Sequence, residues 1–443
     1  MAIATSGKDV LAKFYDEGAY RELYAQGQSA VVAAFGSANG TPAYAVCQTG
    51  AAMSAKDAAK VVKTLQLAAE TGNPVVTFYQ SAGVKLEEGL DALAGTAEVA
   101  DAVAKISGVV PQIAVVTGLC GASNALAAAN ADLCIMSREA QLFLTAPFTS
   151  AAAGDKKEGA GSADFAAKAG VAAIVVDNAE EAAAKAAELV GLLPANNLAG
   201  PAVFEPAAPA GSYQLAKYKA EDAVKSLADA DSVLPLYEGC GSRVYTALAT
   251  VGGNVAGIAA TEDAALCRES VSKMARFVRL CDAFSIPVVT VVNTEGFAAT
   301  STGDEAGGLR EAARLSGTYG DATTALVNVI TGKAYGAACA AMAHADLTIA
   351  VEGCTISPLD PKAVVTVLYK EELEQGNNIA GDTAKKAAQY AAEHCSAAAA
   401  VAAGLADFAV PAAEARAALV SALDMLSTKR TQRLPKKHGN MAL

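Results

Sequence analysis

The sequence contains no tryptophan, and aromatic residues make up only 5% of its 443 residues. It also lacks a charge-free apolar run of membrane-spanning length, because the Ala-rich stretch 396–410 is short and carries Asp407. The hydrophobic fraction is nevertheless 53%, and it comes largely from alanine. We therefore expect a helix-rich interior of closely packed small side chains and no membrane-spanning segment.

Histidines and the common phosphate-binding motifs are equally scarce. The three histidines are His344, His394 and His438. We place His344 inside an Ala-rich helix and expect a buried or structural role for each, which argues against a Ser/His/Asp triad. No Gly-x-x-x-x-Gly-Lys-Ser/Thr or Gly-x-Gly-x-x-Gly motif follows a strand, so nucleotide binding is unsupported. No cluster of His, Cys and Asp has the spacing of a metal site, and we expect no metal.

The nine cysteines are an odd number, and no two of them form a Cys-x-x-Cys pair. We interpret them as reduced thiols of a cytoplasmic protein, not as disulfides or zinc ligands. The N-terminus lacks a basic segment that leads into a Leu-rich run, so we expect no signal peptide. The net charge of −12 argues against a nucleic-acid partner, because such partners are held through phosphate contacts.

The sequence does contain one pattern twice. In the second half, the β-branched run 327–330 is followed by Thr331-Gly332, by a turn rich in Gly and Ala, and by a small-residue segment that we expect to form a buried helix. The repeated positions are Thr117-Gly118 with Thr331-Gly332, 131–133 with 345–347, Gly83 with Gly296, and Gly40 with Gly253, at spacings of 214 (331 − 117) or 213 (296 − 83) residues.

This repeat predicts an α/β protein of two units related by internal duplication, residues 1–200 and residues 212–443. The proline-containing stretch 198–211 joins them. Each unit is expected to begin its sheet with a β-hairpin, at 31–47 and at 244–260, followed by a helix and a parallel strand. We expect residues 1–24 to be mainly helical, with a turn at 16–22 that leads into the first strand.

A Gly/Ala turn between a strand and a helix leaves backbone N–H groups without partners at the helix start, where the helix dipole also favours negative charge. Such a turn suits a developing oxyanion, although Gly and Ala also occupy turns for packing alone. Two such turns, together with very few candidate acid or base side chains, indicate a reaction in which enolate or ureido oxyanions are stabilised. The substrate or cofactor then moves its own proton.

Several segments of the chain resemble a known family. They are 273–290, 307–310, 331–338, 428–430 and 435–440 in the second half and, more loosely, 89–95, 110–113 and 193–197 in the first. These segments are similar to the carboxyltransferase subunit of biotin-dependent acyl-CoA carboxylases and decarboxylases, of the methylmalonyl-CoA decarboxylase alpha or propionyl-CoA carboxylase beta type. The resemblance spans about residues 12–443.

The resemblance implies two tandem crotonase-like subdomains of the ββα-superhelix type. The first would hold an acyl-CoA thioester, and the second, in a partner subunit, would hold biotin. Matched by motif, the thioester-side N–H donors fall at Ser123 and Asn124. The biotin-side donors fall at Ala337 and Ala338. The residues expected to line the substrate sites are Gly83, Gly121, Ala122, Gly296, Gly336 and Ala340.

The implied activity is transfer of a carboxyl group between a short acyl-CoA and biotin on a separate carrier protein, since no Met-Lys-Met occurs in this chain. The resemblance also implies a cytoplasmic homo-oligomer, either a dimer or a trimer of dimers. Membrane decarboxylase subunits are further partners in one branch of the family. The acyl group and the direction of transfer stay open.

Three positions depart from the family pattern. The usual Ala-Gly-Gly-Ala of the first turn is Gly-Ala-Ser-Asn at 121–124, and its two larger side chains are expected to crowd the site. The usual Ser-Gly-Gly-Ala-Arg is Ser-Ala-Gly-Val-Lys at 81–85, and an expected Asp is Ala340. One alternative is therefore a non-catalytic scaffold subunit. Another is a crotonase-type hydratase or isomerase, although no Glu lies in or just after either turn.

Overall fold

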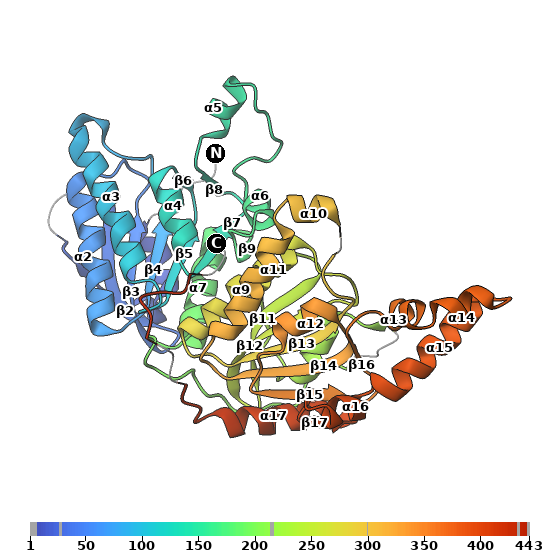
Figure 1. Cartoon of the computed structure of the whole chain (residues 1–443). Helices are drawn as coiled ribbons and strands as arrows, with labels where there is room; N and C mark the ends of the chain where they lie inside the picture. Colours follow the sequence, from blue (N-terminus) through green and yellow to red (C-terminus); the bar gives the residue numbers. More distant parts are fainter. Residues whose placement is uncertain (1–6, 26–28, 213–216, 299, 432–434, 441–443) are drawn as a thin grey trace. The chain divides into compact units, whose positions relative to one another are not determined.

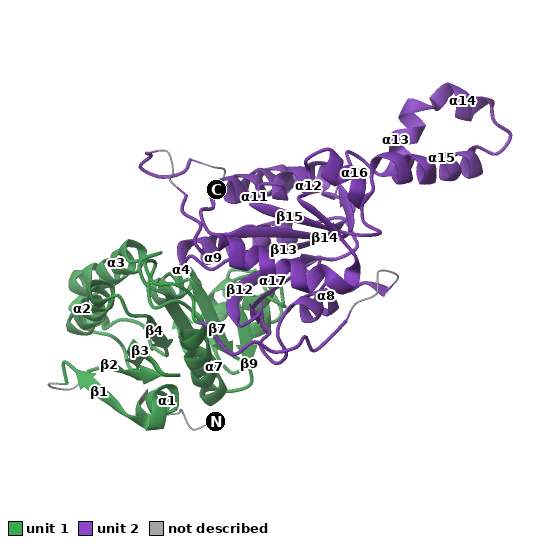
Figure 2. Ribbon diagram, turned by 90° about the horizontal axis from the view of Figure 1, so that it is seen from below, with its two compact units in different colours: residues 1–202, 237–240 green, residues 203–236, 241–443 purple. Residues whose placement is uncertain are grey.

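The structure, a computed structural model, describes residues 7–25, 29–212, 217–298, 300–431 and 435–440. The chain divides into two compact units, which Figure 2 shows in different colours. Unit 1 consists of Met1–Ala202 with Tyr237–Cys240, and unit 2 consists of Val203–Leu236 with Gly241–Leu443. Each unit has a mixed α/β fold with its own sheet and core.

The main sheet of unit 1 has seven strands in the order β1-β2-β3-β4-β5-β7-β9. The first three are antiparallel to one another, and from β3 onward the strands are parallel. A separate two-stranded sheet pairs β6 with β8. The strands are β1 (Tyr20–Leu23), β2 (Val31–Ala38), β3 (Thr41–Gln48), β4 (Val75–Tyr79), β5 (Gln112–Val116), β6 (Leu119–Gly121), β7 (Leu133–Ser137), β8 (Gln141–Phe143) and β9 (Ile174–Val176).

Helices cover both faces of this sheet. The buried faces of α2, α3 and α4 form one core with the strands, and buried side chains of α1 and α7 lie on the other face. The helices are α1 (Gly7–Phe14), η1 (Asp16–Gly18), α2 (Ala55–Thr71), η2 (Leu86–Glu88), α3 (Leu90–Lys105), α4 (Ser123–Asn130), α5 (Pro147–Ala152), α6 (Ala163–Lys168) and α7 (Ala179–Leu192).

The structure corrects one expectation for the N-terminal segment. Only Gly7–Phe14 of the first 24 residues forms an α-helix among the described ones, and Tyr20–Leu23 is the edge strand β1. The polarity of this stretch suggested a helix, but the residues of β1 pair with β2 instead. Tertiary pairing has overridden a weak local preference here.

Helix α2 shows how the sequence sets its own boundaries. The Ser54 hydroxyl accepts from the Asp57 N–H while the Asp57 carboxylate accepts from the Ser54 N–H, which is a capping box. Asp57 also accepts from the Ser29 hydroxyl at 2.5 Å and the Ala30 N–H at 3.1 Å, so it ties the helix start to the hairpin. Gly72 ends the helix with φ +67°, a conformation that glycine adopts without strain.

Unit 2 repeats this sheet order as β10-β11-β12-β13-β14-β15-β17, with β16 paired to the end of β14. Again the first three strands are antiparallel and the rest are parallel. The strands are β10 (Leu234–Leu236), β11 (Val244–Val251), β12 (Asn254–Thr261), β13 (Val288–Thr294), β14 (Leu326–Tyr335), β15 (Leu347–Val351), β16 (Thr355–Ser357) and β17 (Phe408–Val410).

The helices of unit 2 include a projecting arm. Helices α13, α14 and α15 extend away from the body of this unit in both views (Figures 1 and 2), whereas α8 and α17 share a core with one face of the sheet. The helices are α8 (Ala220–Leu227), α9 (Arg268–Ala283), α10 (Ser301–Glu305), α11 (Gly308–Asp321), α12 (Gly336–Met342), α13 (Pro361–Leu368), α14 (Lys370–Gln375), α15 (Ile379–His394), α16 (Ala397–Ala402), η4 (Ala412–Glu414) and α17 (Ala415–Leu426).

The dipeptide Thr331-Gly332 belongs to the strand that precedes the turn of unit 2. It lies inside β14, which runs without a break from Leu326 to Tyr335. A Cβ atom on Gly332 would lie 2.3 Å from the Asn293 side-chain oxygen, and one on Gly118 would lie 2.6 Å from the Gln80 side chain. The repeated glycine is therefore required by close packing against a polar side chain of the neighbouring strand.

The basic C-terminal segment packs against unit 2. Lys429 donates to the Asp346 carboxylate and to the Thr324 carbonyl, each at 2.7 Å, and Lys436 is paired with Asp321. Asp346 also accepts from the Leu326 N–H at 2.8 Å, as Asp132 accepts from the Gln112 N–H in unit 1. No helix in the described ranges has the length and hydrophobicity needed to cross a membrane.

An aspartate fixes the hairpin turn of unit 2. Asp229 accepts from the Thr250 hydroxyl at 2.8 Å and from the N–H groups of Gly252 and Gly253 at 2.9 and 2.7 Å. Arg416 of α17 donates to the same carboxylate at 2.5 Å. Burial raises the pKa of Asp229, but these hydrogen bonds outweigh it and the net pKa is lowered. The ionised carboxylate is thus the form that stabilises the fold.

The hairpin turn of unit 1 is held in the same way. Asp16 accepts from the Ser37 hydroxyl at 2.7 Å and from the N–H groups of Asn39 and Gly40 at 2.8 and 2.9 Å. It lies 213 residues before Asp229 (229 − 16), but it is exposed to solvent. Water can therefore replace part of what Asp16 provides.

We predict that Asp229→Ala lowers the free energy of unfolding by about 3 kcal/mol, because Arg416 and two backbone N–H groups lose a charged partner. The exposed counterpart Asp16→Ala should cost about 1 kcal/mol or less. Urea unfolding at neutral pH measures both. Since the folded-state pKa of Asp229 is depressed, its contribution is complete above the usual Asp pKa and lost as pH falls below it. Equal losses for the two variants, or a pH-independent difference, would contradict the prediction.

Candidate functional site

The carboxyl ends of two adjacent parallel strands bring the predicted residues of unit 2 together. Thr294 of β13 pairs with Ala334 of β14. Gly296 and Gly336 each follow two residues later, and a Cβ atom on Gly296 would lie 3.6 Å from the Tyr335 carbonyl oxygen. The turn after β13 therefore lies beside the start of α12.

Unit 1 has the same arrangement. The Ser81 N–H donates to the Leu119 carbonyl at 2.9 Å, so the segment after β4 runs beside β6. Gly83 and Gly121 again follow two residues later, Gly83 beyond the end of β4 and Gly121 at the end of β6. A Cβ atom on Gly121 would lie 2.6 Å from the Phe143 ring, which explains the glycine by packing. Within unit 1, Gly83 thus lies near the start of α4.

A hydroxyl group that the sequence analysis did not single out holds each of these turns. The Ser81 hydroxyl accepts from the Gly83 N–H at 3.1 Å and reaches the Ala51 carbonyl at 3.4 Å. In unit 2, the Thr294 hydroxyl accepts from the Gly296 N–H at 3.3 Å and donates to the Ala264 carbonyl at 2.8 Å. Ser81 and Thr294 are 213 residues apart (294 − 81), so the repeat spacing could have identified them.

The next residue in each turn presents a backbone N–H that was also missed. Val84 forms a parallel bridge with Met53, and Phe297 forms one with Leu266. In such a bridge, the residues on either side of Val84 form the hydrogen bonds to Met53. The Met53 N–H donates to the Gly83 carbonyl at 2.8 Å. The N–H groups of Val84 and Phe297 therefore point to the opposite side, and they have no hydrogen-bond partner in the described ranges.

The helix starts supply further N–H groups. Ala122, just before α4, has φ +49° and ψ −118°, and Gly336, 214 residues later (336 − 122), has φ +59°. No side chain caps the first turn of α4 or α12, and the first N–H groups of a helix have no partner within it. The predicted donors Ser123, Asn124, Ala337 and Ala338 all lie in these first turns.

The side chains at these positions differ in exposure. Ala122, Ala337 and Ala340 are exposed, whereas Ala338 is fully buried. Asn124 is only 9% exposed, and its Oδ1 accepts from Gln48 Nε2 at 3.2 Å. Gln48 therefore fixes the orientation of the Asn124 side chain beside the helix start.

A charged cluster flanks the start of α12. The Lys333 ammonium lies 3.0 Å from Asp263 and 2.9 Å from Glu295. The hydrogen bond to Glu295 is the main cause that raises the pKa of Lys333. Burial raises the pKa of the Cys339 thiol, so this cysteine of α12 stays protonated at neutral pH. The site therefore offers donors and a fixed ion cluster, but no thiolate.

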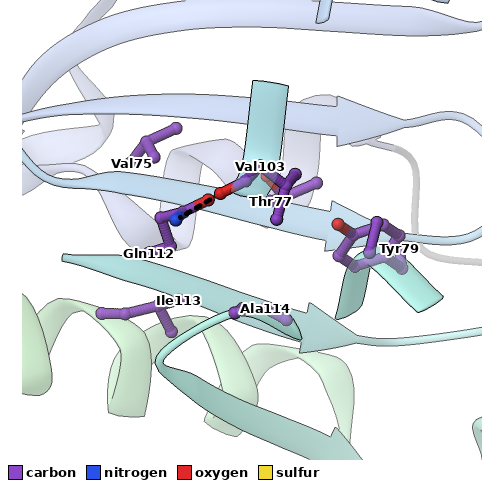
Figure 3. Close-up of a pocket in the computed structure, with 9 residues that line it drawn as sticks. Val75, Thr77, Tyr79, Val103, Gln112, Ile113 and Ala114 are labelled. Carbon is purple, nitrogen blue, oxygen red and sulfur yellow. Dashed lines mark hydrogen bonds between the residues drawn. The ribbon is translucent and has the colours of Figure 1, made fainter. Parts of the chain in front are cut away.

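A small cavity in unit 1 is not part of this site. It has a volume of about 10 Å³ and lies between β4, β5 and the helices above them, lined by Val75, Thr77, Tyr79 and Gln112 among others (Figure 3). That volume is barely enough for one water molecule. It cannot hold an acyl chain.

The expectation of buried histidines was wrong for all three. His344 lies after the end of α12, not within it, and is exposed. His394 ends α15 with its side chain 60% exposed, beside Tyr390 and Glu393. His438 is exposed as well. The alanine-rich composition suggested a longer helix than α12, which ends at Met342.

Comparison with known proteins gives a consistent result. The family model described as the carboxyl transferase domain matches residues 8–441. Methylmalonyl-CoA decarboxylase subunit alpha of Veillonella parvula is 28% identical over 481 residues, which cover 99% of this chain and 93% of that protein. The biotin-dependent acetyl-/propionyl-coenzyme A carboxylase beta6 subunit of Mycobacterium bovis is 30% identical over 386 residues, 82% of this chain and 81% of that one.

A solved structure agrees in fold. The crystal structure of transcarboxylase 12S, with methylmalonyl-coenzyme A and methylmalonic acid bound, matches with a TM-score of 0.92 at 27% identity. The match covers 99% of this chain and 92% of that one, and its authors describe a hexamer.

We predict that Ala122→Gly stabilises the protein by about 1 kcal/mol. An alanine held at positive φ costs about 1 to 3 kcal/mol, which exceeds the entropic cost of a glycine in the unfolded chain. Thermal or urea unfolding measures the gain. Ala125→Gly inside α4 is the matched control and should lose about 1 kcal/mol. A destabilised Ala122→Gly would show that the backbone at this turn is not strained.

Proposed function

The chain belongs to the carboxyl transferase family, and we propose that it moves a carboxyl group between an acyl-CoA and biotin. The observation that carries this proposal is the pair of uncapped helix starts, each beside a turn with a free backbone N–H. The match over residues 8–441 confirms the resemblance read from the sequence. The protein is an enzyme of the biotin-dependent carboxyltransferase and decarboxylase class.

We further propose that the two units are crotonase-like subdomains that arose by duplication. Their sheets share one strand order and one pattern of pairing directions. The supporting hydrogen bonds recur at the repeat spacing, for example at Asp16 and Asp229 and at Ser81 and Thr294. Such polar contacts are more specific than a shared fold, because unrelated sheets of the same topology have no reason to repeat them.

Unit 1 is proposed as the acyl-CoA side. The N–H groups of Val84, Ser123 and Asn124 are available to a thioester oxygen that gains negative charge as the enolate forms. Gly83 leaves this place open, since a Cβ atom there would meet nothing within 4 Å, and Ala122 adds only a methyl group. A short acyl group is proposed because the relatives are named for methylmalonyl-, acetyl- and propionyl-CoA.

Unit 2 is proposed as the biotin side, where biotin on a separate carrier protein supplies the transferable carboxyl group. The residues fit a ring with a polar oxygen, since the exposed Ala337 leaves room beside the uncapped first turn of α12. The N–H groups of Phe297, Ala337 and Ala338 would bind that oxygen, and Gly296 and Gly336 allow a close approach. Ala340 lies exposed one turn further along the helix.

The cellular compartment, the partner subunits and the direction of carboxyl transfer are proposals as well. The nine cysteines form no disulfide in the described part of the chain, which fits the reducing cytoplasm. The kinship with a decarboxylase alpha subunit suggests membrane decarboxylase subunits as partners, whereas the kinship with a carboxylase subunit suggests carboxylation. The fold serves either direction, because the same N–H donors stabilise the same charge.

Two other functions make different demands on the site. A scaffold subunit would have an inactive first turn, but the donors of α4 remain uncapped, and Gln48 holds the Asn124 side chain in one orientation. A hydratase or isomerase needs a free carboxylate beside the turn. Glu295 adjoins Gly296, but it is paired with Lys333. The carboxyltransferase is therefore the function that the geometry favours.

Incubation of the purified protein with malonyl-, methylmalonyl- or glutaconyl-CoA and free biotin tests the proposal. Decarboxylated acyl-CoA that forms only when biotin is present supports carboxyl transfer. Hydration of an enoyl-CoA without biotin would identify a hydratase. Binding of acyl-CoA without any turnover would identify a scaffold.

In this assay we predict that Ala337→Val lowers biotin-dependent turnover about 100-fold. The side chain is exposed beside the first turn, so added bulk blocks approach to the N–H groups, and one oxyanion donor is worth about 3 kcal/mol. Ala343→Val, at the far end of the same helix and also exposed, is the control and should behave as wild type. Normal turnover of Ala337→Val would place the biotin site elsewhere.

We also predict that the protein is a homo-oligomer, a dimer or a trimer of dimers. Large apolar side chains are exposed in both units, such as Leu86 at 83% and Leu90 at 81% in unit 1 and Val367 at 73% on the arm. Light scattering after size exclusion should give a mass well above the 44.4 kDa of one chain.

Glutamate at both Leu86 and Leu90 should shift this mass downward, because an interface that covers them would then have to bury two unpaired charges. A stable wild-type monomer would contradict the prediction.

A further inference from the structure

A chain of amide groups in unit 1 orients the Asn124 side chain. The Gln80 backbone N–H donates to Gln48 Oε1 at 3.2 Å. A backbone N–H can only donate, so this contact fixes which end of the Gln48 amide is oxygen. Gln48 Nε2 then donates to Asn124 Oδ1 at 3.2 Å and approaches the Met53 sulfur at 3.3 Å.

Asn124 Nδ2 is therefore turned away from Gln48. It has no hydrogen-bond partner in the described ranges, yet it retains contact with solvent although the residue is only 9% exposed. A side chain near a helix start leans toward the N-terminal end of the helix. Asn124 is the second residue of α4, so its Nδ2 lies alongside the uncapped first turn.

Unit 2 has no counterpart of this amide pair. The positions that correspond by the repeat spacing are Thr261 for Gln48 and Ala338 for Asn124. The Thr261 hydroxyl accepts from the Asn293 N–H at 2.8 Å. This hydrogen bond corresponds to the one from the Gln80 N–H to Gln48, but Ala338 has no side-chain amide to correspond to that of Asn124. The side-chain donor is therefore specific to the acyl-CoA side, where the backbone N–H groups already serve the thioester oxygen.

We propose that Asn124 Nδ2 binds the transferable carboxylate of an acyl-CoA that carries a carboxyl group on the carbon next to its thioester, and that Gln48 positions Asn124 for this. The inference rests on the proposed function of unit 1. In such a substrate the carboxylate lies only two bonds from the thioester carbon, within reach of a donor on the same helix turn. A neutral amide binds it without the charge pairing that would oppose its loss.

Calorimetric titration of the full chain with malonyl-CoA and acetyl-CoA tests the proposal, since only the first carries the carboxylate. Asn124→Asp keeps an oxygen that accepts from Gln48 but replaces the Nδ2 donor by a negative charge, which repels the substrate carboxylate. The affinity for malonyl-CoA should therefore fall at least about tenfold, whereas the affinity for acetyl-CoA should change by less than about twofold. Asn130→Asp, exposed at the end of the same helix, is the matched control and should leave both affinities unchanged.

Two further variants test the roles of Asn124 and Gln48 separately. Asn124→Ala installs the residue that unit 2 has and should lower malonyl-CoA affinity about threefold to tenfold, again sparing acetyl-CoA. Gln48→Met should reduce the preference for malonyl-CoA because Nδ2 is no longer held.

Equal losses for both ligands, or none, would overturn the assignment of Asn124. An unchanged preference in Gln48→Met would overturn the role of Gln48. A wild-type protein that binds neither ligand would instead refute the acyl-CoA function itself.

Discussion

The parallel alignment of adjacent strands is the constraint on which the rest of each unit depends. Pairing of Thr294 with Ala334 places two turns side by side at the carboxyl edge of the sheet of unit 2, and the contact of Ser81 with Leu119 does so in unit 1. Side chains alternate along a strand, so a shift of one residue would turn these positions to the other face. The donors converge because the register is fixed.

Polar contacts behind the turns stabilise that register, and they recur in both units. The hydroxyls of Ser81 and Thr294 hold the glycine turns, and Asp132 and Asp346 fix the opposite ends of the strands. None of these groups is among the proposed donors. Their recurrence at one spacing is the expected result when both units need the same backbone geometry for different substrates.

The hairpins, the capped helix Ala55–Thr71 and both turns could be predicted from the sequence, because each depends on local signals such as Ser54, Gly72 and the repeated glycines. The edge strand Tyr20–Leu23 could not, since its pairing is non-local. The repeat revealed Gly332 but not its cause, which is the side chain of a neighbouring strand. Likewise, no local pattern shows that Gln48 reaches Asn124 across 76 residues.

The two sites differ in the residue that precedes or begins the helix. At the positive-φ position, unit 2 has Gly336 and unit 1 has Ala122, so unit 1 retains a strained residue. Strain of this kind persists only where the surroundings hold the backbone, and here the Ala122 N–H is bound to the Phe143 carbonyl at 3.0 Å. The alanine thus shows that the strand contacts, not the glycine, determine the turn. A duplicated unit can therefore change the residues that meet its ligand while the donors stay in place.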